Sequence, residues 1–161
     1  MKVAIYGQYF KIEDKKYVEE LFGTLHKHQI EFVIEKNYYS GLTKHVQIGP
    51  VATFSSYDDL NSSFDYMVTV GGDGTILRAV TFVRNLNLPI LGINTGRLGF
   101  LATVQKEDIA QAIELLLTEK VIIKKRALLS VSTSPKISSL SSLNFALNEV
   151  TVNRKNTASM I

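Results

Sequence analysis

A strand, a glycine-rich turn and a helix follow one another from Asp65 to Leu77, and this stretch limits the possible folds more than any other. Tyr66–Val70 is short and apolar without alternation, which is typical of a strand covered on both faces in a parallel sheet. Beyond the turn, apolar residues recur with a helical period up to about Arg84. The Gly-Gly-Asp-Gly turn at residues 71–74 allows positive φ and lets a ligand approach the backbone amides.

The start of the helix after this turn predicts an anion site. Its unpaired N–H groups and the positive end of its dipole face the turn, and phosphate is the usual anion at such a place. Asp73 lies inside the turn, where a carboxylate repels phosphate unless a cation separates them or the carboxylate takes up a proton during chemistry. Asp is also a favoured helix cap, which gives Asp73 a purely structural alternative. The turn by itself leaves both interpretations open.

Two common nucleotide-binding signatures do not fit this turn. The chain contains no Gly-x-x-x-x-Gly-Lys-Ser/Thr, which excludes a P-loop, and Leu77 replaces the third glycine of a dinucleotide fingerprint. The turn resembles instead the Gly-Gly-Asp-Gly-Thr signature of NAD kinases, diacylglycerol kinases and sphingosine kinases, of which phosphofructokinases carry a near variant. Residues 94–101 and 146–152 resemble two further NAD kinase segments, Asn-x-Gly-x-Leu-Gly-Phe-Leu and a strand that contains Asn-Glu. Three motifs in this order indicate the NAD kinase family.

The resemblance implies an activity and assigns residues to it. NAD kinases transfer the terminal phosphoryl group of ATP, or of polyphosphate in some members, to the 2′-hydroxyl of the adenosine ribose of NAD, giving NADP, with Mg²⁺ or another divalent cation. A ribose hydroxyl is a weak nucleophile, and Asp73 is the candidate base that accepts its proton. The resemblance places the following residues against the nucleotides: Asp73, Gly74, Arg78, Phe100, Asn148 and Glu149.

Several of these residues also have ordinary structural explanations. Arg78 lies one turn into the predicted helix and fits a solvated helix residue, and Phe100 fits core packing. Asn94, in the second motif, fits a side chain that hydrogen-bonds its own turn. Asn148 and Glu149 fall in a predicted strand, where both residue types are disfavoured. Their position in a strand therefore needs an explanation. The resemblance to NAD kinases implies that they contact the ribose hydroxyls and the adenine.

The predicted fold class is α/β, with a doubly wound Rossmann-like domain of the phosphofructokinase and NAD kinase type over residues 1–101. We expect its alternating strands and helices at residues 2–6, 13–28, 31–35, 51–54, 66–70, 76–84 and 88–93, with a loop over most of 37–59. An amphipathic helix is expected at 106–120, followed by strands at 121–125, 127–133 and 144–152. Residues 102–161 thus begin an all-β second domain without closing strands, and we expect the chain to be a truncated part of a longer protein.

Composition and charge argue against several classes of partner. The 161-residue chain has a formal charge of +3 and scattered basic residues, which argues against nucleic acid. No apolar run reaches membrane-spanning length, and no cysteine is present, so we expect a cytoplasmic protein that uses neither membrane nor disulfide. Its three histidines follow no metal spacing and are interpreted as surface residues. We expect small nucleotides as partners and a homo-oligomer at full length.

Two other functions remain open at this point. A lipid kinase of the diacylglycerol type would share the glycine-aspartate turn, but it would have no use for an Asn148–Glu149 ribose contact. The chain could also be a nucleotide-binding fragment without catalytic activity, because an incomplete second domain cannot close a cleft over Asp73. Phosphoryl transfer to NAD and to diacylglycerol, measured side by side, separates these functions.

Overall fold

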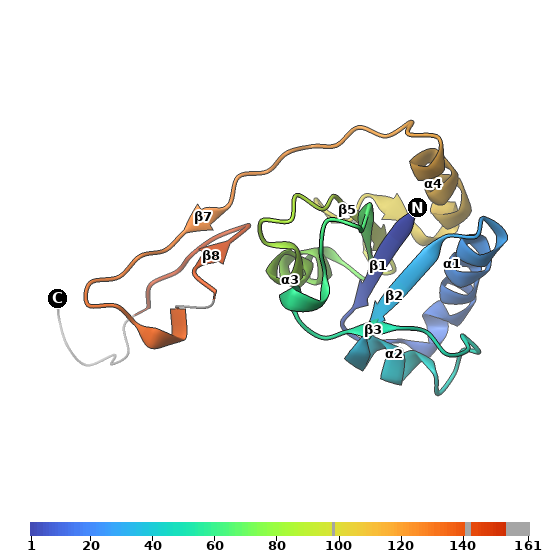
Figure 1. The fold of residues 1–161 in the computed structure, drawn as a ribbon, viewed down its shortest axis with the longest axis horizontal. Coiled ribbons are helices and arrows are strands. Elements are labelled where there is room, and N and C mark those ends of the chain that lie inside the picture. Colours follow the sequence, from blue (N-terminus) through green and yellow to red (C-terminus); the bar gives the residue numbers. More distant parts are fainter. Residues whose placement is uncertain (98, 141–142, 154–161) are drawn as a thin grey trace. The chain divides into compact units, whose positions relative to one another are not determined.

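Six parallel strands form one sheet in this protein, and helices cover both of its faces (Figure 1). The computed structural model describes residues 1–97, 99–140 and 143–153. The strands are β1 (Lys2–Gly7), β2 (Glu31–Glu35), β3 (Thr53–Phe54), β4 (Tyr66–Val70), β5 (Ile90–Asn94), β6 (Val104–Gln105), β7 (Leu129–Ser130) and β8 (Phe145–Ala146). The α-helices are α1 (Lys15–Lys27), α2 (Lys36–Leu42), α3 (Asp73–Val83) and α4 (Ile109–Leu117). Short 3-10 helices are η1 (Ile12–Asp14), η2 (Tyr57–Asp59), η3 (Lys106–Asp108) and η4 (Ser138–Leu140).

The sheet order is β3-β2-β1-β4-β5-β6, which places the first strand of the chain in the middle. The chain runs outward from β1 through β2 and β3, returns to β4 beside β1, and then runs outward through β5 and β6. This is the doubly wound order, and ligands of such sheets bind at the carboxyl ends of the strands where the direction changes. That place lies between β1 and β4, whose last residues Gly7 and Val70 pair with each other.

Alternate strand residues divide the core of the sheet into two layers. Val3 and Ile5 of β1 pack in one layer with apolar residues of α1 and α4. Ala4 and Tyr6 pack in the other layer with apolar residues of α3. Because both faces are covered, the central strands are mostly apolar, which is the pattern that predicted a parallel sheet. The predicted α/β fold class is confirmed.

The first compact unit spans Met1–Ile123 and differs from the predicted domain in three places. α2 lies where a loop was expected, and β6 adds an edge strand that the sequence analysis did not include. α4 contributes to the same core layer as α1, so this unit extends beyond the predicted boundary at residue 101. The helix that was grouped with the second domain thus completes the cover of the sheet.

The second unit, Lys124–Ile161, contains less strand than the sequence predicts. Residues 121–125 form no strand, and the other two predicted strands shrink to β7 and β8, which pair antiparallel. The prediction is wrong in extent because strand propensity needs packing partners. In the described part of this unit, Leu129 is 49% exposed and Val152 is 96% exposed.

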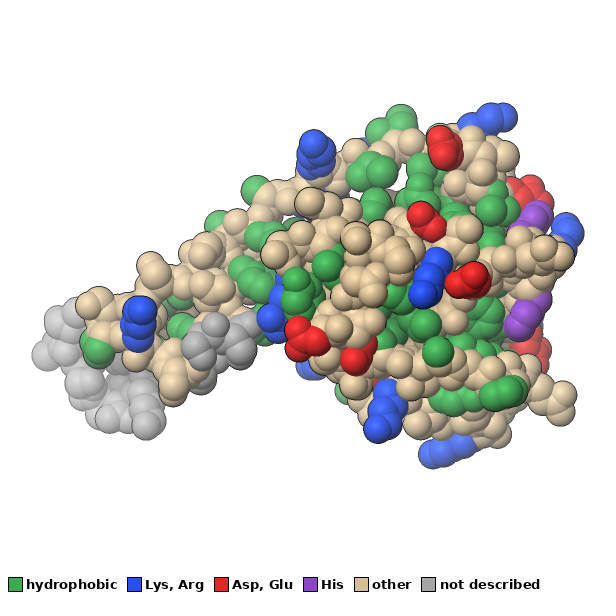
Figure 2. All heavy atoms as spheres, in the orientation of Figure 1, with side chains coloured by type: hydrophobic (Ala, Val, Ile, Leu, Met, Phe, Trp, Pro, Cys, Tyr) green, Lys and Arg blue, Asp and Glu red, His purple; other side chains and the backbone are tan. Residues whose placement is uncertain are grey.

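Charged side chains of both signs alternate over the first unit on the face shown in Figure 2. This face therefore carries no extended patch of one sign, which matches the scattered basic residues of the sequence. Within the described residues, no helix has both the length and the apolar character needed to cross a membrane.

Candidate functional site

The turn between β4 and α3 requires glycine at its first position. Gly71 has a φ of +149°, and a Cβ there would overlap the side chain of the buried Thr75. Gly72 is the N-cap of α3 and Asp73 is the first helical residue. Neither Gly72 nor Gly74 has a positive φ, and a Cβ at either would meet no atom within 4 Å. The backbone conformation therefore explains why residue 71 is glycine. It does not explain why residue 74 is glycine.

Asp73 binds the loop after β5. Its carboxylate accepts hydrogen bonds from the N–H groups of Phe100 at 2.7 Å, Leu101 at 2.9 Å and Ala102 at 3.0 Å. These three donors fix the position of the carboxylate. The interpretation of Asp73 as a helix cap is wrong, because Gly72 holds the cap position. Asp73 instead ties the turn after β4 to the loop after β5.

Gly99 makes room for this arrangement. A Cβ at Gly99 would overlap the carboxylate of Asp73, so the loop can approach only because this residue is glycine. Neither the Gly99 contact nor the three N–H donors is predicted from the sequence. The available signal was a glycine without an assigned role, next to Phe100 in the second motif.

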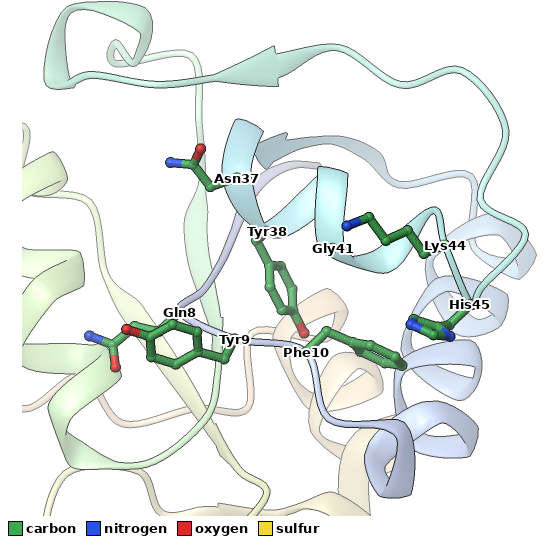
Figure 3. Close-up of a pocket in the computed structure, with 8 residues that line it drawn as sticks. All are labelled: Gln8, Tyr9, Phe10, Asn37, Tyr38, Gly41, Lys44 and His45. Carbon is green, nitrogen blue, oxygen red and sulfur yellow. The ribbon is translucent and has the colours of Figure 1, made fainter.

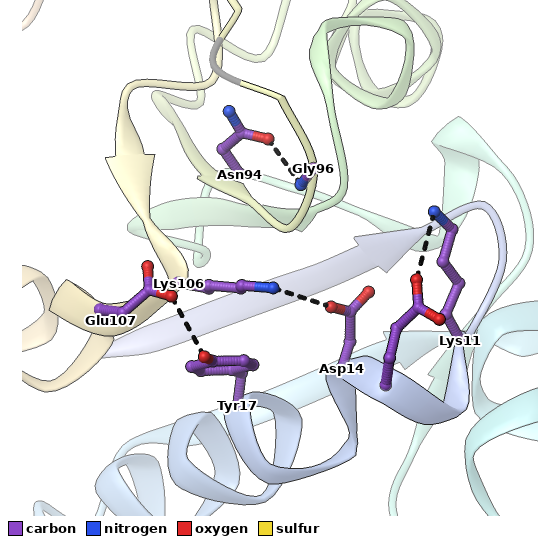
Figure 4. Close-up of polar contacts among 8 residues, drawn as sticks. Lys11, Asp14, Tyr17, Asn94, Gly96, Lys106 and Glu107 are labelled. Carbon is purple, nitrogen blue, oxygen red and sulfur yellow. Dashed lines mark hydrogen bonds and ion pairs between the residues drawn. The ribbon is translucent and has the colours of Figure 1, made fainter.

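Asn94 forms hydrogen bonds with the backbone of the same loop (Figure 4). Its side chain is buried, accepts a hydrogen bond from the Gly96 N–H at 2.9 Å and donates one to the Arg97 carbonyl at 2.9 Å. The interpretation that Asn94 bonds its own turn is confirmed. The loop therefore leaves β5 in a fixed direction.

The far end of the loop is anchored to α1 and to η1 before it (Figure 4). Lys106 Nζ lies 3.7 Å from Oδ1 of Asp14, whose side chain is only 6% exposed. The hydroxyl of Tyr17 donates a hydrogen bond to Oε1 of Glu107 at 3.1 Å. The segment that supplies the N–H donors for Asp73 is thus held on both sides.

The other predicted site residues divide between the two units. Gly74 and Arg78 are exposed on α3, and Phe100 is 92% exposed, which rules out the core-packing alternative. Asn148 and Glu149 are exposed in the second unit and lie beyond the end of β8. The expectation that they sit inside a strand is wrong, because pairing with β7 ends at Ala146. The first unit brings together the residues around Asp73, and the Asn-Glu pair belongs to the second.

Comparisons of sequence support the fold and the motifs. The family model of the ATP-NAD kinase N-terminal domain matches residues 3–121. The chain is 48% identical over 162 residues to the NAD kinase of Flavobacterium psychrophilum, covering 100% of this chain and 55% of that protein. It is 44% identical to the NAD kinase of Flavobacterium johnsoniae and 34% identical to that of Bacteroides fragilis, covering 55% and 54% of those proteins. The chain thus spans about half the length of the relatives it matches.

Two solved structures have the same fold. Yeast NADH kinase complexed with NADH aligns with a TM-score of 0.69 at 20% identity, over 81% of this chain and 39% of that one. An NAD kinase from Archaeoglobus fulgidus in complex with ATP aligns with a TM-score of 0.53 at 22% identity, over 88% of this chain and 44% of that one. At these identities the two solved structures show only that the fold is shared. The family is shown by the sequence matches. The chain belongs to the ATP-NAD kinase family, through the N-terminal domain that its residues 3–121 match.

Proposed function

We propose that this chain supplies the phosphate-facing turn and the base of an NAD kinase, which transfers the terminal phosphoryl group of ATP to the 2′-hydroxyl of the adenosine ribose of NAD. The observation that carries the proposal is the position of Asp73. It is the first residue of α3, at the carboxyl end of a central strand, and three backbone N–H groups hold its carboxylate. A fixed carboxylate at a helix start places a proton acceptor beside a phosphate site.

The reaction needs one bond to form and one to break at phosphorus. The ribose 2′-oxygen bonds to the terminal phosphorus of ATP, the bond from that phosphorus to the bridging oxygen breaks, and ADP leaves. The hydroxyl proton passes to the Asp73 carboxylate and then to solvent. General-base catalysis of this kind contributes roughly 10²- to 10⁴-fold in rate.

Four kinds of contact would position the substrates. The backbone of Gly74 lies at the helix start, where it would face phosphate, and the exposed Arg78 would pair with a phosphate charge. The exposed ring of Phe100 would stack on adenine. Asn148 and Glu149 would hydrogen-bond the ribose and the adenine. These roles follow the family resemblance, and exposure of all five residues leaves them accessible to ligands.

A divalent cation would enter with the nucleotide. Among the described residues, no group of three or more His, Cys, Asp or Glu side chains could hold a metal ion. Mg²⁺ commonly binds through substrate phosphates with few protein ligands, so it would arrive as part of the ATP substrate. The proton transfer to Asp73 uses the chain's own carboxylate.

We also propose that the full-length protein is cytoplasmic, forms a homo-oligomer and binds neither nucleic acid nor membrane. Light scattering of the full-length protein tests the assembly. Lipid phosphorylation is not favoured, because the relatives that the chain matches are NAD kinases.

The experiment is a chimera in which residues 1–161 replace the matching part of the Flavobacterium psychrophilum NAD kinase. We expect the chimera to form NADP from ATP and NAD and to leave diacylglycerol unmodified. Residues 1–161 alone should form none, since they span only about half the length of the NAD kinases that they match. A folded chimera without NADP formation would contradict the proposal, and the non-catalytic alternative would then hold.

A further inference from the structure

A pocket of about 270 Å³ lies at the carboxyl ends of β1 and β2, among residues to which no role is assigned above (Figure 3). Gln8, Tyr9 and Phe10 line it from the segment after β1. Gly41 lines it from α2, and Lys44 and His45 from the residues after that helix. Pockets for small ligands hold roughly 300–1,000 Å³, so this one can take part of a nucleotide while the rest extends outside.

The described lining of this pocket is basic and amide-rich. It includes the Lys44 ammonium and the His45 imidazole, and no carboxylate. The nearby Glu35 carboxylate is buried and accepts hydrogen bonds from the Tyr38 N–H at 2.8 Å and from Nδ2 of Asn37 at 3.0 Å. These hydrogen bonds hold the start of α2, and the Lys44 ammonium on the lining of the pocket favours an anionic ligand.

One end of the pocket also suits a planar ring. Phe10 and His45 stack with ring centroids 5.4 Å apart and an interplanar angle of 24°, so a planar base can add to the stack only on an outer face of this pair. Gly41 leaves space in front of it, since a Cβ at Gly41 would meet only Cβ of Phe10, at 3.8 Å. Tyr9, which is 82% exposed, adds a third ring toward the opposite end of the pocket (Figure 3). Flat aromatic walls bind nucleobases by stacking without regard to base identity.

The other end of the pocket lies at the same edge of the sheet as the glycine turn. Gly7 pairs with Val70, so Gln8 and Gly71 follow neighbouring strands at the same edge of the sheet. Figure 3 shows Gln8 and Tyr9 at the end opposite His45, with Lys44 extending back along α2 between the two ends.

A further cation lies on the same side. Burial raises the pKa of the Tyr6 phenol, and the positive charge of Arg78 opposes this rise, which places the guanidinium within electrostatic reach of the end of β1. Tyr6 also hydrogen-bonds the Gln8 side chain. Basic and amide groups thus lead from the stacked rings to α3, whose first residue is Asp73.

We propose that this pocket binds the base and ribose of the nucleoside triphosphate that donates the phosphoryl group. The base lies against Phe10 and His45, and the phosphates run past Lys44 and Gln8 toward Arg78 and the glycine turn. The proposal rests on the proposed function and adds a donor site on the β1–β2 side of Asp73. The acceptor NAD then occupies the β5 side, where Phe100 is exposed.

The binding test uses residues 1–161 and three probes: ATP, inorganic tripolyphosphate and NAD. Backbone NMR signals of Phe10, Gly41 and His45 should shift with ATP. Tripolyphosphate should shift residues 71–78 and leave the Phe10–His45 end unchanged, because it carries no ring. NAD should leave that end unchanged as well.

Two variants and their controls test the pocket directly. Gly41→Leu fills the space before the stacked rings and should weaken ATP binding about tenfold or more. Gly23→Leu is the control, since a Cβ at Gly23, in α1, meets no atom within 4 Å. His45→Ala removes one ring of the stacked pair and should weaken ATP binding without filling the pocket. His26→Ala, in α1, is its control.

The outcomes separate this proposal from the proposed function. In the chimera, Gly41→Leu should raise the KM for ATP and leave the KM for NAD unchanged. An unchanged KM for ATP in a chimera that forms NADP would overturn the pocket and leave the kinase activity standing. If ATP shifted the NMR signals of Phe10 and His45 in a chimera that forms no NADP, the pocket would stand and the proposed kinase activity would be overturned. NAD shifting the same signals as ATP would also overturn the donor assignment.

Discussion

Gly99 lies so close to Asp73 that a single methyl group on Gly99 would overlap the Asp73 carboxylate. The two residues come from neighbouring motifs, one in the loop after β5 and one at the start of α3. Their contact keeps the Phe100–Ala102 N–H groups aimed at the carboxylate. The position of Asp73, the proposed base, therefore depends on the lack of a side chain at residue 99.

Gly99→Ala should disrupt the site without touching a substrate. The added methyl group displaces the loop, and a displacement near 1 Å in a reacting group can cost about 10² in rate. We expect a comparable loss of NADP formation in the chimera, with a stability loss on the order of 1–3 kcal/mol from weakened charged hydrogen bonds. Gly96→Ala is the control in the same loop, since its Cβ would meet only Oδ1 of Asn94, at 3.9 Å. Equal activity of the two variants would contradict the role of the contact.

Asp73→Asn should lower NADP formation by about 10² to 10⁴ while NAD still binds. The amide cannot accept a proton from ribose, and its NH₂ group would face N–H donors of the loop. The NMR signals of Phe100, Leu101 and Ala102 report the loop separately from turnover. Asp59→Asn is a matched control, because Asp59 also accepts backbone hydrogen bonds, from Ser55 at 2.7 Å and Ser56 at 2.9 Å. A variant that keeps more than about a tenth of the rate would leave Asp73 a structural residue only.

Gly74→Val should block nucleotide binding and leave the protein folded. Gly74 is exposed, and a Cβ there meets no atom within 4 Å, so the fold tolerates the side chain, and valine has a higher helix propensity than glycine. Phosphate at the helix start would collide with it. Calorimetric titration with ATP and NAD gives the affinities, and unchanged values would show that phosphate does not approach Gly74.

Acid should destabilise the protein partly through Asp59. Backbone hydrogen bonds from Ser55 and Ser56 hold the pKa of the Asp59 carboxyl below its usual range. Because the folded pKa is lower, this contribution is present above the unfolded pKa of about 3.9 and is lost as the pH falls through the folded value. Urea unfolding across this range should show a shallower pH dependence for Asp59→Asn. Asp58→Asn, at a neighbour with no hydrogen bond or ion pair in the described chain, should match the parent.

The periodicity of the sequence predicts the first unit well because its central strands are covered on both faces and its helices bury one face each. Tyr66–Val70 and Glu31–Glu35 have the predicted bounds, since a buried parallel strand leaves a continuous apolar run. The short helix α2 was missed because Lys36–Leu42 carries only two buried residues, Tyr38 and Leu42. Polar residues around so narrow an apolar face resemble a loop.

The residues of the site could be predicted from the sequence, but the contacts between them could not. The glycine turn and Asp73 follow from local sequence, whereas the hydrogen bonds from Phe100 and Leu101 join positions 27 and 28 residues away from Asp73. Only the parallel pairing of β4 with β5 brings those positions together. The strands predicted in the second unit were too long because their apolar residues lack cover in the described structure.

The central place of β1 has a consequence for how the chain is made. Val3 of β1 pairs with Tyr66 of β4, and the Lys2 N–H donates a hydrogen bond to Asp65 at 2.7 Å across a separation of 63 residues. During synthesis, β1 can pair with β2 as soon as residue 35 has emerged, but its other edge has no partner until β4 follows. Such non-local pairing slows folding, and an open strand edge can pair with another nascent chain. A translational pause between β2 and β4 would therefore promote aggregation more than a pause after β4, when both edges of β1 are filled.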